Sequence, residues 1–241
     1  GMKAVVAGVE YTAPAKVSLI RKSTITIGVD PTQTFDGTPY EFKAWSDGGA
    51  PTHTLQVIGN RILKAEFVPT AAIAFSVPKA TNTRVVPVKW LKKQGAVKYY
   101  LIEGAGKPPV VGSNLWHATP PATFEVSAGE GVKVIRGWAL NANSRISPVF
   151  RASTVLDTTK PKATLAGPGS TDKRVIAIAI KATDRTGITG YFLSESKARP
   201  EAGADTWRSK KPTTFQLTAT PGEHRVYLWV RDGAGNVSTA V

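Results

Sequence analysis

Ser46, Asp47 and His53 lie close together in the stretch AWSDGGAPTH (residues 44–53). These three residue types form a hydrolytic triad when the imidazole reaches the serine hydroxyl and an oxyanion hole faces the substrate. The central Asp-Gly-Gly, however, is typical of a hairpin, because glycine reaches positive φ without a Cβ clash and aspartate bonds nearby backbone N–H groups. We therefore predict a hairpin at this stretch, with Trp45 in a small core, and no catalytic residue.

A second candidate set consists of oxygen ligands. Asp184, Asp232 and Asn236 fall in turns between predicted strands, where they could hold Ca²⁺, a hard cation that takes about six or more oxygens. Arg185 and Arg231 flank the two aspartates and oppose a divalent ion. Aspartates that cap turns explain the pattern with fewer assumptions, so we predict no metal site and no cofactor.

The cysteine and histidine content narrows the chemistry further. The 241 residues include no cysteine and three histidines, which lie in separate segments. This composition excludes a disulfide framework, a thiolate zinc site and a cysteine nucleophile. Together with the turn-like character of AWSDGGAPTH, it predicts a protein without enzymatic activity.

The segments around these candidate residues are short runs with the periodicity of β-strands. Alternating or β-branched stretches recur between glycine, proline, aspartate and asparagine, as in TITIGV, THTLQV, RVIAIAI, TTFQL and HRVYLWV. Runs of this length and spacing indicate sandwiches or barrels. We therefore expect an all-β protein.

An internal repeat sets the expected domain organisation. Residues 73–157 and 158–241 align with one extra residue before the tryptophan of the first copy. The matched pairs include Tyr99 with Tyr191, Trp116 with Trp207, Phe124 with Phe215, Trp138 with Trp229 and Ser147 with Ser238. Each copy has a size that suits an immunoglobulin-like sandwich. We predict three tandem β domains: a small one at 1–70 and two immunoglobulin-like sandwiches at 71–157 and 158–241.

Strand parity indicates an aromatic stripe on the outer face of a sheet. If Leu228 and Val230 face the core, Tyr227 and Trp229 face outward, because successive side chains of a strand point to opposite faces. The candidate ligand-binding residues are Phe192, Tyr227 and Trp229, with Tyr100 and Trp138 in the other copy. Such a stripe could stack on sugar rings. Alternatively, the long connection that carries Trp207 could fold over it and bury it.

The formal net charge of +14 comes mainly from the last two thirds of the chain. Lys92-Lys93 and Lys210-Lys211, with Arg174, Arg199 and Arg208, would attract a polyanionic cell-surface polymer with strong salt dependence. No nucleic-acid-binding motif accompanies these scattered residues, so we expect no specific nucleic acid as a partner. A solvated surface is the alternative explanation of the charge.

The third predicted domain carries ATDRTGITGYFLSES and HRVYLWVRDGAGNVS. These segments resemble the bacterial immunoglobulin-like or fibronectin type III-like tandem repeats, in which an Asp-x-x-Gly-Asn turn follows the penultimate strand. The middle copy has Asn141-Ala142-Asn143-Ser144-Arg145 at this turn, without the Asp and Gly of the motif, so properties of the turn are in doubt there.

Residues 1–70 resemble a small all-β bacterial repeat related to divergent internalin B-repeats. The resemblance rests on Trp45–Ala50 (WSDGGA), on His53-Thr54 and on Ala65-Glu66-Phe67. The two resemblances identify scaffolds and imply no shared activity. We expect a monomeric structural or adhesion module of a bacterial secreted or cell-surface protein, extracellular and without a membrane span. Its partner would be an unknown protein or glycan, and its signal peptide would lie outside this sequence. The alternative is a carbohydrate- or polyanion-binding accessory module of an extracellular enzyme.

Overall fold

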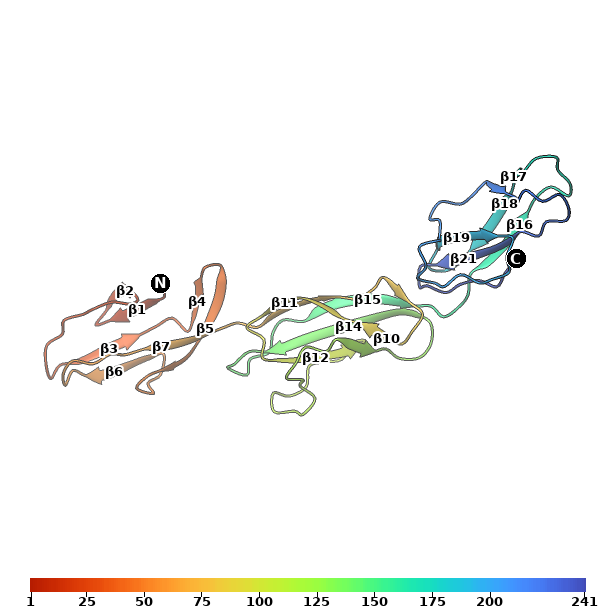
Figure 1. Ribbon diagram of the computed structural model, residues 1–241. Coiled ribbons are helices and arrows are strands. Elements are labelled where there is room, and N and C mark those ends of the chain that lie inside the picture. Colours follow the sequence, from red (N-terminus) through yellow and green to blue (C-terminus); the bar gives the residue numbers. More distant parts are fainter. The chain divides into compact units, whose positions relative to one another are not determined.

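The computed structural model describes residues 1–241, and strands are its only long regular elements (Figure 1). The all-β fold expected from the short alternating runs is confirmed. No helix has the length and apolar character that crossing a membrane requires.

The chain packs as two compact units. Unit 1 consists of residues 1–76, 89–121 and 136–151, and unit 2 consists of residues 77–88, 122–135 and 152–241. The division passes through residues 71–157, so the boundaries 1–70, 71–157 and 158–241 stay a prediction.

Residues 1–70 form two antiparallel sheets. The first has the order β2-β1-β3-β6 and the second the order β4-β5-β7. The strands are β1 (Lys3–Val6), β2 (Val9–Thr12), β3 (Thr24–Gly28), β4 (Thr32–Phe35), β5 (Thr38–Trp45), β6 (Thr52–Gln56) and β7 (Ala65–Pro69). Their shared core forms around buried Ile27, Val29 and Trp45, which confirms Trp45 as a core residue.

Residues 72–156 form three sheets, with the orders β11-β8, β10-β13 and β12-β14-β15-β9. The strands are β8 (Ala72–Ser76), β9 (Ala80–Thr81), β10 (Val85–Pro87), β11 (Lys89–Gln94), β12 (Lys98–Glu103), β13 (Thr123–Glu125), β14 (Gly131–Leu140) and β15 (Phe150–Leu156). Two apolar clusters belong to this stretch within unit 1, one around Ile73 and Tyr99 and the other around Trp116 and Trp138.

The last stretch, residues 162–232, forms three two-stranded sheets, β16-β18, β17-β20 and β19-β21. The strands are β16 (Lys162–Ala166), β17 (Val175–Ala177), β18 (Ala179–Thr183), β19 (Ile188–Ser194), β20 (Thr214–Gln216) and β21 (Tyr227–Asp232). Their inward residues form one core that includes Ile178, Ile180, Leu228 and Val230. A core shared by strands of different sheets makes this stretch a layered β structure.

The strand pairings of the last stretch repeat those of the one before it. In β10 and β13, Val86 pairs with Phe124; in β17 and β20, Ile176 pairs with Phe215. The pairs β8-β11 and β12-β14 correspond in the same way to β16-β18 and β19-β21. The two aligned sequence segments therefore have the same local topology.

Candidate functional site

The segment between β5 and β6 is a turn, but it does not form the expected hairpin. β5 pairs with β4 and β7, whereas β6 pairs with β3. The turn therefore carries the chain from one sheet to the other. The expectation was wrong because six residues separate the two strands, which leaves room to change sheets, whereas a two-residue loop would force pairing.

Ser46 and His53 do not contact each other as a triad requires. The Ser46 Oγ accepts a hydrogen bond from the Lys64 N–H (3.0 Å). The His53 Nδ1 donates to the Ala50 carbonyl (2.8 Å), and its Nε2 lies 3.2 Å from the Asp47 Oδ2. Burial acts to raise the pKa of Asp47, but hydrogen bonds from Gly49 and His53 outweigh it and lower the pKa. These contacts hold a turn in place.

The predicted aromatic stripe exists, and it is covered. Phe192 pairs with Trp229 across β19 and β21, and their rings lie 5.9 Å apart on the side opposite Leu228. Trp207 packs on Phe192 at 6.2 Å, and Trp229 is only 2% exposed. Tyr227 is half-buried and lies 6.0 Å from Trp229. Parity therefore placed the side chains correctly, and Trp207 covers part of the predicted stripe.

The same cover forms in the other copy. Trp116 lies 6.0 Å from Tyr100, and Trp138 is 7% exposed. The two covering tryptophans are held alike: the Nε1 of Trp116 donates to the Val110 carbonyl (3.0 Å) and that of Trp207 to the Glu201 carbonyl (2.8 Å). An exposed stripe at Phe192, Tyr227, Trp229, Tyr100 and Trp138 was one of two alternatives. Trp229 and Trp138 are buried, whereas Phe192, Tyr227 and Tyr100 are half-buried, and ligand binding at these residues stays a prediction.

The turn that follows β14 or β21 is built alike in both copies, despite its different residues. The Asp232 Oδ1 accepts from the N–H groups of Ala234 (2.9 Å) and Asn236 (2.8 Å). The Asn141 Oδ1 accepts from those of Asn143 (3.0 Å) and Arg145 (2.9 Å). An asparagine therefore reproduces the backbone hydrogen bonds of the aspartate turn.

Each of these turns also bonds to the segment that precedes its repeat. In unit 1, the Glu41 Oε2 accepts from the Asn141 Nδ2 at 2.9 Å and lies 3.3 Å from the Arg145 Nε. The Asn143 Nδ2 donates to the Phe42 carbonyl at 3.1 Å. In unit 2, the Asn236 Nδ2 donates to the Asp157 carbonyl at 2.8 Å. The turns are thus the candidate functional contacts of the chain.

Glu130 fixes the connector that begins at Asp157. Its Oε1 accepts from the N–H (2.9 Å) and the Oγ1 (2.7 Å) of Thr158 and from the Oγ1 of Thr159 (2.8 Å). These hydrogen bonds favour the ionised form and lower the pKa of Glu130 below its ordinary value. The connector is therefore held from both sides within unit 2.

Three carboxylates converge beside this connector. Asp157, Asp184 and Asp232 offer oxygens that all lie within 4.8 Å of one another. Burial raises the pKa of Asp232, hydrogen bonds from Asn236 act against it, and the charge of Asp184 raises it further. Asp184 and Asp232 were considered as calcium ligands from the sequence, whereas Asp157 was missed because it lies in the connector, far from both along the chain.

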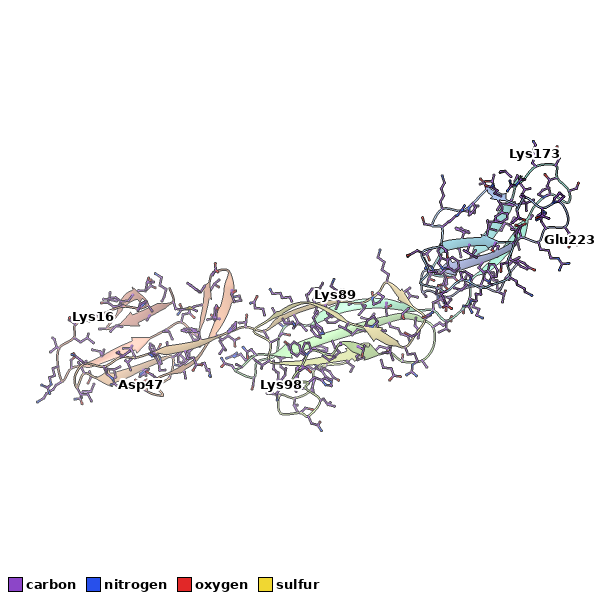
Figure 2. All side chains as sticks on the ribbon, in the orientation of Figure 1. Lys16, Asp47, Lys89, Lys98, Lys173 and Glu223 are labelled. Atoms are coloured by element: carbon purple, nitrogen blue, oxygen red, sulfur yellow. The ribbon has the colours of Figure 1, made fainter.

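Basic side chains are distributed over many elements. The lysines labelled in Figure 2, Lys16, Lys89, Lys98 and Lys173, are all exposed and lie on different parts of the chain. One denser group lies beside Trp207, where an open hollow of about 540 Å³ is lined by Arg208, Lys210 and Lys211.

Comparison with known proteins shows likeness to fibronectin-type modules at low identity. No protein-family model matches the chain, and no curated protein matches it. It is similar to the fibronectin(III)-like modules of Clostridium thermocellum CbhA, with 15% identity over 70% of this chain and 90% of that chain and a TM-score of 0.41. It is also similar to the FN1–FN3 domains of chicken CNTN1, with 10% identity over 100% and 98% of the two chains and a TM-score of 0.38. Likeness at this level does not assign the chain to a family.

Proposed function

We propose that the chain is a non-enzymatic structural or adhesion module of a bacterial secreted or cell-surface protein. Its repeats would keep successive segments at defined distances and present loops to a protein or glycan partner. The observation that carries this proposal is the position of the turns: in both repeats, the turn after β14 or β21 bonds to the segment before that repeat, at Glu41 and at Asp157.

These contacts have the strength that a spacer needs. A hydrogen bond contributes about 0.5–1.5 kcal/mol net, and one to a charged group about 1.5–3 kcal/mol. Several such bonds offset the entropy of fixing a few connector residues, about 1–2 kcal/mol each. Glu130 and Asn236 together supply four bonds to the connector at Asp157, Thr158 and Thr159.

The proposal that the module is non-catalytic has its own support. Ser46 and His53 each bond to other groups, and their geometry is that of a turn. Asp47, Glu130 and Asp232, whose pKa values are shifted, accept hydrogen bonds in turns or at the connector. An extracellular location and a monomeric state are part of the same proposal. The location is suggested by the sequence resemblances.

Distance measurements between spin labels test the spacer role. The chain has no cysteine, so Lys79→Cys and Asp172→Cys introduce the only two labelling sites, both exposed and both in unit 2. We expect a narrow distance distribution that broadens when Asn236→Ala is added. A distribution that is already broad without Asn236→Ala would contradict a spacer.

One observation favours the alternative of polyanion binding. The hollow beside Trp207 gathers the exposed Arg208, Lys210 and Lys211 around a partly exposed tryptophan. Cationic side chains next to an aromatic ring suit sulfated or phosphorylated glycans, since they combine charge attraction with a stacking surface.

Heparin chromatography distinguishes this alternative. If the hollow binds polyanions, Lys210→Glu with Lys211→Glu lowers the eluting salt concentration much more than the matched pair Lys92→Glu with Lys93→Glu. Equal shifts for both pairs would show that only net charge matters, and a hollow-specific site would then be rejected.

A further inference from the structure

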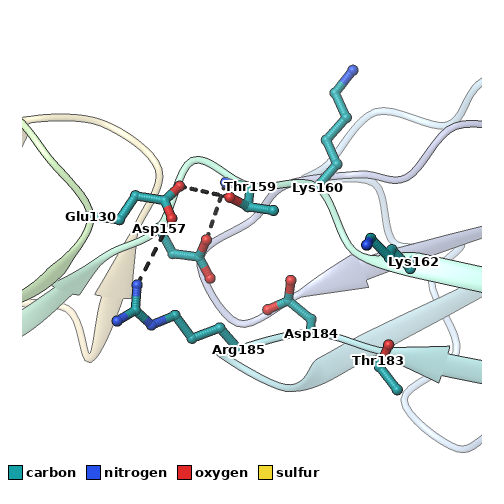
Figure 3. Close-up of a pocket in the computed structure, with 8 residues that line it drawn as sticks. All are labelled: Glu130, Asp157, Thr159, Lys160, Lys162, Thr183, Asp184 and Arg185. Atoms are coloured by element: carbon teal, nitrogen blue, oxygen red, sulfur yellow. Dashed lines mark hydrogen bonds and ion pairs between the residues drawn. The ribbon is translucent and has the colours of Figure 1, made fainter.

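We propose that Asp157, Asp184 and Asp232 bind one Ca²⁺ beside the connector. This proposal differs from the prediction made from the sequence, which was that the chain holds no metal. All three residues lie in unit 2. Figure 3 shows Asp157 and Asp184 with their carboxylates turned toward each other in a pocket of about 320 Å³.

The geometry suits one ion. The three carboxylate oxygens lie within 4.8 Å of one another, which is about twice the usual Ca²⁺–oxygen distance of roughly 2.4 Å. A single ion between them is therefore near bonding distance from all three. Water molecules in the open pocket complete the coordination that Ca²⁺ requires.

A second observation points to a ligand independently of the clustering. Asp157 is completely buried, and its Oδ2 has no hydrogen-bond partner, while its Oδ1 accepts from the Thr159 N–H at 3.1 Å. A buried, unpaired carboxylate oxygen is costly unless a cation or a donor satisfies it. A cation bound among the three carboxylates supplies the missing partner.

The nearby arginines do not fill this role. Arg231 follows Val230 in β21, and strand alternation sends it away from Asp232: its Nη1 bonds to the Ala202 carbonyl, and its guanidinium lies 5.2 Å from the Trp207 ring centroid. Arg185 pairs with Glu130 at 3.8 Å. In the folded chain Arg231 therefore points away from the cluster, and Arg185, which lines the pocket, is paired with Glu130.

Two lysines also line the pocket without occupying the cluster. Lys160 extends away from the carboxylates in Figure 3, and Lys162 is exposed at the rim. Asp157, Asp184 and Asp232 bring three carboxylate oxygens within 4.8 Å of one another, and their like charges repel. A bound Ca²⁺ would remove this repulsion.

The middle copy of the repeat lacks the turn residues of the proposed Ca²⁺ site and can be compared directly with the last copy. Asn141 stands where this copy has Asp232, and Arg145 stands where it has Asn236. That turn instead satisfies Glu41 with its own amide and guanidinium groups. The site is therefore specific to the second connector.

The test is calorimetric titration of the chelator-treated full chain with CaCl₂ and, separately, with MgCl₂. Asp232→Asn is the main variant, because Asn141 shows that asparagine accepts the same two backbone hydrogen bonds in the sister turn. Asp172→Asn, which removes an exposed carboxylate elsewhere in unit 2, is the matched control.

We expect one Ca²⁺ per chain with a dissociation constant of roughly 10⁻⁴ to 10⁻³ M, as in other extracellular modules. Asp232→Asn should weaken binding at least about tenfold, with Asp172→Asn unchanged and Mg²⁺ weaker than Ca²⁺. No binding up to about 10 mM Ca²⁺, or equal binding by Asp232→Asn and the wild-type chain, would overturn the site. Tighter binding of Mg²⁺ would overturn the choice of ion.

Asp157→Asn and thermal unfolding provide a second readout. A ligand that binds only the folded chain raises its melting temperature with concentration. Ca²⁺ should raise the melting temperature of the wild-type chain and of Asp172→Asn, but not that of Asp157→Asn or Asp232→Asn. A Ca²⁺-induced rise of the same size in all four proteins would contradict the assignment.

Discussion

Asn236 donates from its Nδ2 to the carbonyl of Asp157, 79 residues earlier in the chain, at 2.8 Å. The same Nδ2 lies 2.7 Å from the Asp232 Oδ2, so one amide joins the turn after β21 to the start of the connector. At the matched turn, Asn141 and Asn143 bond to Glu41 and Phe42. The shared placement of these amides links local turn geometry to the proposed role of the repeats.

Asn236→Ala should lower the free energy of unfolding by about 1–3 kcal/mol, because it removes both bonds of the Nδ2 and leaves polar partners unpaired. Chemical denaturation followed by tryptophan fluorescence measures the change. Asn114→Ala, at an exposed position, is the control and should change the free energy little. Equal stabilities of the two variants would show that the amide contributes nothing to the fold.

Trp229→Ala should lower the free energy of unfolding by roughly 3–5 kcal/mol, the range for removing a large buried ring. Trp138→Ala should behave alike, because the cover is repeated in the other copy. Leu91→Ala truncates an exposed side chain and serves as the control. A small loss for Trp229→Ala, accompanied by reduced binding on a glycan array, would restore the exposed-stripe interpretation.

Gly137→Ala should destabilise the chain by about 1–3 kcal/mol through overpacking. A Cβ at this position would lie 2.6 Å from the Phe75 ring and 2.9 Å from a Leu101 methyl group. Gly112→Ala, where a Cβ meets nothing within 4 Å, is the matched control. If both variants melt at the wild-type temperature, Phe75 does not occupy this space as tightly as described.

Acid should release the connector through Glu130. Its pKa is lowered by hydrogen bonds from Thr158 and Thr159, so its contribution to stability is fully present above its ordinary pKa of 4.5 and is lost as the pH falls through the lowered value. The amide signal of Thr158, followed by NMR, should therefore titrate with a midpoint below 4.5. Glu130→Gln should abolish this transition, whereas a wild-type midpoint at or above 4.5 would contradict the stated direction.

Much of the fold follows from local sequence patterns. Alternation in HRVYLWV placed Leu228 in the core and Trp229 on the opposite face, because successive side chains of a strand must diverge. Whether Trp229 was covered could not be predicted, since that depends on how a long loop folds back and where the Trp207 indole finds its acceptor.

The contacts at the connectors were harder to predict. The sequence showed Asp232 beside Arg231, but strand alternation in β21 turns these two side chains apart, and folding brings Asp157 and Asp184 to Asp232. Adjacent residues in a strand face opposite sides, whereas groups that share a site come from distant segments. The hairpin expected at Asp47-Gly48-Gly49 failed for a related reason, because turn chemistry does not determine which sheet the next strand joins.

Spin-label distances across residues 70–71, the first connector, which joins β7 to β8, test whether the turns hold the connectors. The acidic cluster lies elsewhere in the chain, so a bound cation does not affect this measurement. Lys64→Cys and Lys98→Cys provide exposed labelling sites within unit 1. We expect a narrow distance distribution that broadens with Glu41→Ala, which removes the acceptor for Asn141 and Arg145. Distributions of equal width with and without Glu41→Ala would contradict the claim that the turns hold the connectors.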